Sequence, residues 1–216
     1  MAKDLAVILS NGSINSAVAA TLCAQRYRTV MMNVAVSPEM NRSLRSAYDQ
    51  QVAHFKPYRE HTIQMPWLAA LAKEAASGIQ DPRMRAAIGP QLMDLLPLVA
   101  VAARYAAHYQ AAAVYLGLRV GPGVDELAQA AEWVSIWNEM IQMPCGQNEI
   151  EVQTPILELE PWQIVDLGLQ VSAPLDKTWS CIEETPSPCG ACRGCRNREA
   201  WFVQAGKADP AKPKAK

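Results

Sequence analysis

The chain has 216 residues and a formal net charge of −1, with 50% apolar and 19% charged side chains. This length and apolar content predict a globular protein, with a single domain over residues 1–206. The balanced charge excludes a broad basic surface for nucleic acid, and no apolar run approaches the length of a membrane span.

Short apolar runs alternate with helical patterns along the chain. The first run, Leu5–Leu9, predicts a buried strand, because a continuous apolar run of this length is typical of a parallel sheet. Further strands are predicted at Thr29–Val36, Arg59–Met65, Ala113–Leu116 and Glu149–Thr154. Helices are predicted at Ser16–Arg26, Glu39–Phe55, Pro66–Ala76, Gln91–Gln110, Asp125–Gln142 and Pro161–Gln170, with turns or loops at Ser10–Ser16, Gly78–Gly89 and Gly117–Gly123.

This alternation predicts an α/β fold, in which a doubly wound parallel sheet is covered by helices on both faces. Pro97, inside the long helix Gln91–Gln110, is expected to kink that helix or to mark its true start. Ligands of such folds bind at the carboxyl ends of the strands. The turn Ser10–Ser16 is expected at such an end and is therefore a candidate binding site.

The two ends of the chain carry separate signals. The N-terminal apolar run leads straight into a polar turn and does not resemble a secretion signal, so a cytoplasmic protein is expected. Residues Lys207–Lys216 contain four lysines and two prolines without an apolar anchor, which predicts a disordered tail. These lysines suggest either a weak contact with RNA or solvated surface, and we favour solvated surface.

Four of the six cysteines form a cluster with the spacing C-x7-C-x2-C-x2-C, at Cys181, Cys189, Cys192 and Cys195. Cytosolic thiols stay reduced, so this spacing indicates a metal site rather than disulfides. Four thiolates suit a structural zinc ion in tetrahedral geometry, at about 2.3 Å per bond. An iron–sulfur cluster is the main alternative, whereas catalytic zinc would need an open coordination position.

The neighbours of the cluster are expected to support it. Because zinc with four thiolates carries a formal charge of about −2, nearby cations should help, and three are at hand: Arg193, Arg196 and Arg198. Trp179 and Trp201 are expected to pack around the cluster. Cys23 is expected to be a core residue, and Cys145 a free thiol in a loop.

The cysteine-bearing stretch and the turn after the first strand both resemble motifs of one protein family. The stretch TWSC at 178–181, followed by CGACRGCRNREAWF at 189–202, closely resembles the zinc motif of this family, the 7-cyano-7-deazaguanine synthases. The turn Ser10–Ser16 resembles its Ser-Gly-Gly-x-Asp-Ser loop, the signature of ATP pyrophosphatases. The order of strands and helices, the chain length and the segment Thr154–Ile156 also fit.

The resemblance implies an adenine nucleotide alpha-hydrolase-like fold with a C-terminal zinc-binding subregion. It implies an enzyme that uses ATP and magnesium to adenylate 7-carboxy-7-deazaguanine, and then ammonia to form a nitrile for queuosine-type nucleosides. It assigns no catalytic residue, and places ATP on Ser10, Asn11, Gly12, Ser13, Asn15 and Ser16. The family is commonly dimeric, and the sparse charge on Gln91–Gln110 also favours a homodimer.

The ATP end departs from the family pattern. Aligned on Ser16, the loop has Asn11 in place of the first serine and Asn15 in place of the aspartate. Ser13 replaces the second glycine, where a left-handed conformation would cost about 1–2 kcal/mol. Pro161 stands about where the family has a lysine, and the family's Tyr-Pro-Asp-Cys and Gly-Gln-Arg-His segments are not visible.

Two functions therefore remain open. Gly12 and the loop hydroxyls can still form an anion-binding turn, and Asn15 can still cap the helix. The missing aspartate and lysine predict weak adenylation; Arg119 could supply a cation, but we expect it to be an ordinary solvated arginine. The chain is either an ATP-dependent synthase with weak or altered activity, or a non-catalytic descendant that binds a nucleotide, a deazapurine or a protein partner.

Overall fold

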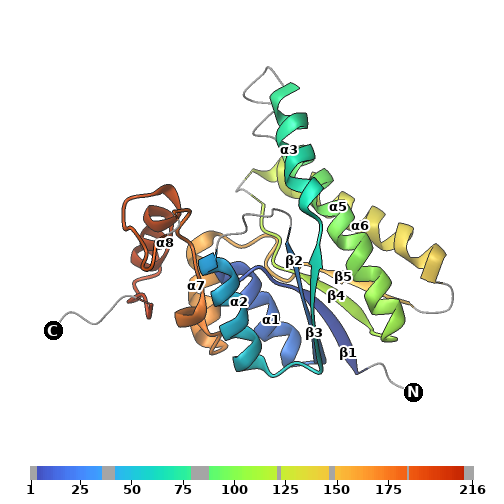
Figure 1. The fold of residues 1–216 in the computed structure, drawn as a ribbon, viewed down its shortest axis with the longest axis horizontal. Helices are drawn as coiled ribbons and strands as arrows, with labels where there is room; N and C mark the ends of the chain where they lie inside the picture. Colours follow the sequence, from blue (N-terminus) through green and yellow to red (C-terminus); the bar gives the residue numbers. More distant parts are fainter. Residues whose placement is uncertain are drawn as a thin grey trace.

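A five-stranded parallel sheet lies at the centre of the structure, a computed structural model that describes residues 4–35, 42–78, 88–120, 123–145, 149–183 and 185–211. The strands lie in the order β3-β2-β1-β4-β5 (Figure 1). Their bounds are Leu5–Leu9 for β1, Arg28–Ala35 for β2, Arg59–Gln64 for β3, Ala113–Leu116 for β4 and Glu151–Gln153 for β5. All five predicted strands are confirmed, and the predicted bounds differ by at most two residues.

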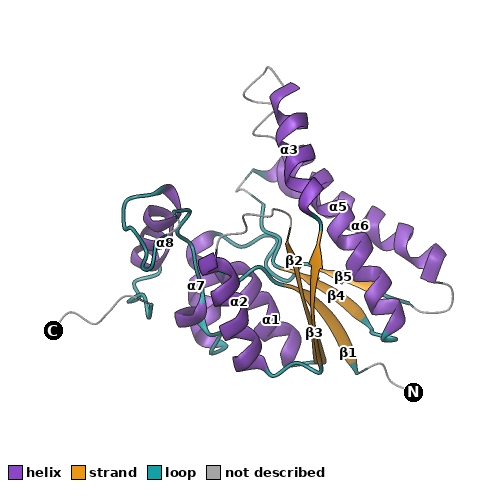
Figure 2. Ribbon diagram, viewed as in Figure 1, coloured by secondary structure: helices purple, strands orange, loops and turns teal. Residues whose placement is uncertain are grey.

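Helices cover both faces of the sheet, as Figure 2 shows. This confirms the predicted doubly wound α/β fold. On one side lie α1 and α2, with α7 packed against α1, and on the other side lie α5 and α6. Their bounds are Ile14–Ala24 for α1, Arg42–Phe55 for α2, Pro66–Gly78 for α3, Ile88–His108 for α5, Val124–Cys145 for α6, Pro161–Gln170 for α7 and Arg193–Gln204 for α8.

The strands divide their side chains between two apolar layers. Val7 of β1 lies opposite Val30 of β2 and Val114 of β4, and all three pack with α5 and α6. Their neighbours Ala6 and Ile8 point the other way and pack with α1 and α2. Because side chains alternate along a strand, burial on both faces requires a continuous apolar run. This is why the sequence signal for β1 and β4 was clear.

The long helix α5 differs from its predicted form. It begins at Ile88 and runs for 21 residues with Pro97 inside it, so Pro97 does not mark its start. The predicted segments 39–41, 79–87 and 121–122 lie outside the described residues. Within the described part of the chain, no helix is long and apolar enough to cross a membrane.

The C-terminal region corrects the prediction of a disordered tail from residue 207. The Lys207 N–H donates to the Phe202 carbonyl at 2.9 Å, and the Asp209 carboxylate pairs with Arg198 at 2.6 Å. The Asp209 side chain is only 5% exposed. Residues 207–211 therefore pack against α8, which was itself not predicted, and residues 212–216 lie outside the described chain.

Candidate nucleotide loop and metal centre

The loop Ser10–Ser16 runs from the end of β1 into the first turn of α1, at the carboxyl edge of the sheet. The strand order reverses here, because β1 lies between β2, which follows it in sequence, and β4, which comes much later. In open α/β sheets, ligands bind at such a reversal point. The structure thus places the predicted binding turn where this fold binds its ligands.

Gly12 sets the path of the loop. Its φ is +86°, and a Cβ atom at this position would lie 2.5 Å from the Leu44 carbonyl oxygen of α2. Only glycine combines this conformation with so close an approach. Ser13 has φ −81° and ψ 169°, so the expected left-handed strain at Ser13 is absent. Ser13 is instead the N-cap of α1, a role expected for Asn15, and its hydroxyl accepts from the Ser16 N–H.

The loop satisfies part of its hydrogen-bonding capacity with its own side chains. The Asn11 Oδ1 atom accepts from the Ser13 N–H at 3.1 Å and from the Ser16 hydroxyl at 3.2 Å. Backbone N–H groups and hydroxyls of this kind are the donors that phosphate loops offer to an anion. The Asn11 amide oxygen therefore already accepts from two donors that an anion-binding loop would offer to its ligand.

A cavity of about 300 Å³ opens beside the loop. Loop residues line one side, together with Asn15 at the start of α1, and apolar side chains such as Met32 and Leu95 line another. Arg119, after β4, also lines the cavity and is half-buried, which corrects the expectation of an ordinary solvated arginine. Among the described lining residues, Arg119 is the sole charged one and none is acidic. The described lining therefore carries a positive charge.

The two positions where the chain lacks a charge that the resembled family carries, Asn15 and Pro161, lie apart. Asn15 lines the cavity, so an aspartate at this position would face it. Pro161 is the first residue of α7, after the N-cap Glu160, and is not among the described residues that line the cavity. Arg119 is thus better placed than residue 161 to act on an anion in this cavity.

The four predicted cysteines come together at the other end of the chain. Their sulfur atoms all lie within 4.8 Å of one another, with 3.6 Å between Cys181 and Cys189 and 3.7 Å between Cys181 and Cys192. The Cys189 and Cys195 sulfurs are 4.0 Å apart. Four sulfurs bound tetrahedrally at about 2.3 Å from one zinc ion would lie about 3.8 Å from each other. The four cysteines therefore fit a metal ion.

Backbone N–H groups point at these sulfurs, as in a thiolate site. Cys192 Sγ accepts from the Cys195 N–H at 3.4 Å, and Cys189 Sγ accepts from the Cys192 N–H at 3.3 Å. Hydrogen bonds from the backbone of Ile182 and Cys195 lower the pKa of Cys192 to about 6. Burial raises the pKa of Cys195 to about 12, so that thiol must lose its proton when metal binds.

Arg198 has a different role from the one expected. Instead of facing the sulfurs, its guanidinium is buried, pairs with Asp209, and donates to Thr178 Oγ1 at 2.7 Å and to the Leu175 carbonyl at 3.0 Å. Arg196 donates to the Ala191 carbonyl and so braces the turn between the cysteines. The arginines thus stabilise the peptide around the site.

The two other cysteines lie away from the cluster in sequence. Cys23 is fully buried between α1 and the sheet, and burial raises its pKa to about 12, which confirms the expected core residue. Cys145 is the last residue of α6 and not a loop residue as expected, and its side chain lies outside the described part of the structure. Of the two tryptophans expected near the cluster, Trp179 donates to the Cys181 carbonyl at 2.8 Å, and Trp201 packs in the apolar cluster of α1, α7 and α8.

Comparison with known proteins identifies the family. The model of the family described as Queuosine biosynthesis protein QueC matches residues 5–206. The chain belongs to the QueC family. The resemblance seen in the loop and the cysteine motif is thereby confirmed over almost the whole chain.

Curated QueC relatives match at low identity but over nearly their full length. The 7-cyano-7-deazaguanine synthase of Koribacter versatilis is 26% identical over 216 residues, which cover 95% of this chain and 91% of the relative. That of Halobacterium salinarum is 26% identical over 235 residues, covering 97% and 96%. This QueC chain therefore has about the same length as these enzymes.

Solved structures support the fold of this QueC chain. NMN synthetase from Francisella tularensis superposes with a TM-score of 0.52 at 18% identity, covering 95% of this chain and 79% of that one. NH3-dependent NAD synthetase from Campylobacter jejuni superposes with a TM-score of 0.51 at 12% identity, covering 82% and 68%. The shared architecture is the adenine nucleotide alpha-hydrolase-like fold, as the resemblance implied.

Proposed function

We propose that this chain acts as a 7-cyano-7-deazaguanine synthase with a weakened ATP loop. Family membership over residues 5–206 carries the proposal, because curated relatives of about the same length have that name. The substrates are then ATP, ammonia and a 7-carboxy-7-deazaguanine-type carboxylate. A second cavity of about 540 Å³ between α2 and the cysteine-bearing segment, lined in part by Ser46, Trp179 and Glu199, offers room for a small acceptor.

The metal in this proposal is one structural zinc ion held by the four cysteine thiolates. Four protein sulfurs close the coordination shell, so the ion stabilises the fold and takes no part in the reaction. Besides the four sulfurs, the chain supplies backbone N–H groups that donate to these sulfurs and so stabilise their thiolate form. The sulfur distances support this proposal and fit a single ion.

The nucleotide in this proposal lies at the loop, with its phosphates near the start of α1 and Arg119. The first N–H groups of an α-helix lack partners within the helix and favour an anion. Magnesium is held less firmly, because the described cavity lining contains no carboxylate. A protein that binds the nucleotide without turnover is the second candidate, and the lack of that carboxylate is the observation that favours it.

Replacing Arg119 with alanine should weaken ATP binding by about tenfold or more. A charge-assisted hydrogen bond is worth about 1.5–3 kcal/mol, and each 1.4 kcal/mol is tenfold in affinity. Isothermal titration of the full chain with ATP measures the effect. Arg26→Ala, in the turn that follows α1, removes the same charge away from the cavity and should leave affinity unchanged. Undetectable ATP binding by the unaltered protein would contradict the proposal and favour a partner-binding protein.

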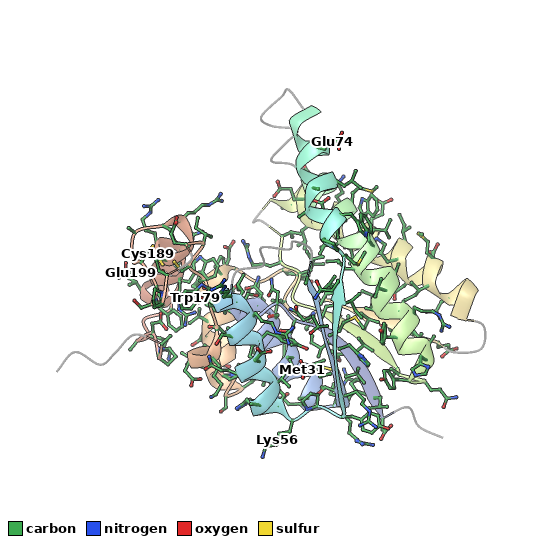
Figure 3. The ribbon with its side chains drawn as sticks, in the orientation of Figure 1. Met31, Lys56, Glu74, Trp179, Cys189 and Glu199 are labelled. Carbon is green, nitrogen blue, oxygen red and sulfur yellow. The ribbon has the colours of Figure 1, made fainter. Side chains whose placement is uncertain are left out.

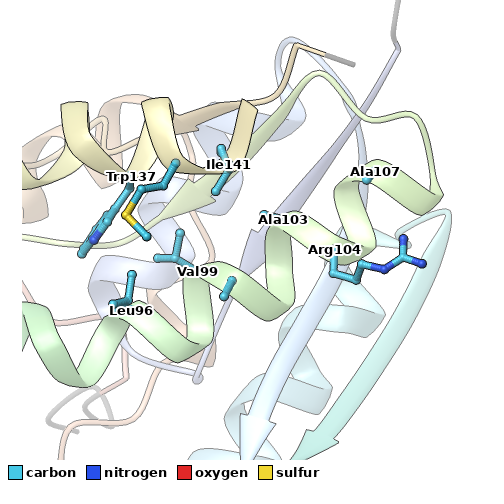
Figure 4. A pocket seen from close by; sticks show the side chains of 9 residues that line it. Leu96, Val99, Ala103, Arg104, Ala107, Trp137 and Ile141 are labelled. Atoms are coloured by element: carbon cyan, nitrogen blue, oxygen red, sulfur yellow. The ribbon is translucent and has the colours of Figure 1, made fainter. Parts of the chain in front are cut away.

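We also propose a homodimer formed through the outer faces of α5 and α6. A cavity of about 610 Å³ lies between these two helices, with a mostly apolar lining that includes Leu96, Ala100, Trp137 and Ile141, and with Arg104 as a charged member (Figure 4). Small alanines on α5 would let a helix of a second copy approach closely. Apolar surface of this kind on a helix is usually covered.

Ala100→Glu should convert the dimer into a monomer. Ala100 is exposed and lines this cavity, so a carboxylate there would be desolvated in the dimer at a cost of several kcal/mol, while the monomer tolerates it. Light scattering at micromolar concentration reports the mass. Ala24→Glu, an equally exposed alanine at the end of α1, is the matched control and should remain dimeric. A monomeric unaltered protein would refute the dimer.

A further inference from the structure

The ATP loop and the cysteine-bearing segment touch, although about 165 residues separate them in sequence. The backbone N–H of Trp179 donates to the Gly12 carbonyl oxygen at 3.0 Å. Figure 3 shows Trp179 between the region of Cys189 and the helix α2. The loop therefore has a direct backbone contact with a residue that lies two positions before a cysteine of the metal site.

Gln51 of α2 makes a second connection between the same two segments. Its Oε1 atom lies 3.1 Å from the Ser10 hydroxyl, and its Nε2 atom donates to the Lys177 carbonyl at 3.0 Å. The side chain is 0% exposed. One amide group thus accepts from the loop and donates to the cysteine-bearing segment, and a side chain without both a donor and an acceptor cannot do this.

Ser10 links Gln51 to the rest of the loop through its own hydrogen bonds. Its hydroxyl also lies 3.1 Å from the Ser16 hydroxyl, and its carbonyl accepts from the Asn33 amide at 2.8 Å. Ser16 in turn contacts Asn11 and Ser13. A shift of Gln51 would therefore disturb the donors that face the cavity.

Helix α8, which carries part of the metal site, also holds residues 175–181, the segment that Gln51 contacts at Lys177. Helix α8 has Cys192 as its N-cap and contains Cys195, and its buried Arg198 donates to Thr178 and to the Leu175 carbonyl. A Cβ atom on Gly194 would lie 1.9 Å from the Ser180 carbonyl oxygen, so α8 and this segment are in tight contact. Closing the cysteine site fixes the start of α8, and with it residues 175–181.

We propose that Gln51 is a positioning residue that couples the metal held by the four cysteines to the order of the ATP loop. Metal binding fixes residues 175–181, these hold Gln51, and Gln51 holds Ser10. The proposal rests on the proposed role of the loop in nucleotide binding. Because coupling between two binding sites is reciprocal, loss of the Gln51 contacts should also loosen the metal.

Hydrogen exchange of the loop amides tests the coupling without any nucleotide. In the metal-loaded chain, chelating the metal should speed exchange across residues 10–16 by about tenfold, a usual size for coupling between sites. Gln51→Met should show faster exchange already with metal bound, and chelation should add less than in the unaltered protein, because among the hydrogen bonds of the described residues only the Trp179–Gly12 bond still links the two segments. Gln25→Met is the control, since Gln25 is an exposed residue at the C-terminal end of α1, away from the loop, and should behave as the unaltered protein.

Two further measurements complete the test. Gln51→Met should weaken ATP binding and speed transfer of the metal to a competing chelator by about tenfold each, with an unchanged circular dichroism spectrum. If Gln51→Met does not fold, Gln51→Glu keeps the acceptor for Ser10 and removes the donor to Lys177. The coupling is overturned if chelation leaves hydrogen exchange of residues 10–16 unchanged. It is also overturned if a Gln51 variant shows the same exchange as the unaltered protein, with and without metal. If the protein does not bind ATP but its loop exchange still depends on the metal, the proposed function is overturned and the coupling stands.

Discussion

Cys192→Ser is expected to abolish metal binding and to lower the free energy of unfolding by about 3 kcal/mol or more. Zinc binding contributes about 10–16 kcal/mol to the folding free energy of small zinc domains. A loss of only about 3 kcal/mol would lower the melting temperature of a chain of this size by about 6 °C or more. Serine is a good N-cap, and its hydroxyl can still accept from the Cys195 N–H as the sulfur does. The stability lost therefore reports the metal and not the helix cap.

Elemental analysis and thermal unfolding measure this effect together. The unaltered protein should contain about one zinc ion per chain, and the variant none. Cys23→Ser is the control, because Cys23 is buried in the core far along the chain from the cluster. It should keep its zinc and lose only the roughly 1–3 kcal/mol that a buried hydroxyl costs. Iron in the unaltered protein, or equal losses in both variants, would contradict the zinc proposal.

Much of the fold was predictable because its signals are local. The strands β1 and β4 are buried on both faces and read as apolar runs, and α7 begins at Pro161, a residue suited to a first helical turn. The cysteine spacing was equally clear. The helix α8 was missed because its charged residues mask the apolar pattern, although Cys192 as N-cap and buried Phe202 could have indicated it.

The parts that could not be predicted depend on contacts between distant residues. Arg198 looks like a counter-charge for thiolates, yet its partner Asp209 lies in a segment whose composition is typical of disorder. Gln51 looks like any polar helix residue, and its two partners lie 41 and 126 positions away. The place of Arg119 beside the loop depends on β1 and β4 being neighbours, which composition cannot show.

The unaltered protein is expected to release pyrophosphate slowly, between about two and four orders of magnitude below a typical enzyme. Losing one electrostatic donor or counter-charge costs about 3 kcal/mol, or roughly two orders of magnitude. Asn15 removes a carboxylate that could help to hold magnesium, and Pro161 removes the family lysine. Arg119 lines the cavity and can offset the second loss in part, whereas the described cavity lining has no acidic residue to offset the first.

Asn15→Asp should therefore raise pyrophosphate release by up to about a hundredfold. The reaction contains 7-carboxy-7-deazaguanine, ammonia, ATP and magnesium, and the gain should grow with magnesium concentration, since the new carboxylate acts through the ion. Asn197→Asp adds the same charge on the exposed face of α8 and should change nothing. Typical enzyme rates in the unaltered protein would refute the weakened loop. A zero rate in both, with ATP bound, would mean that the loop holds the nucleotide without activating it, which is the non-catalytic candidate.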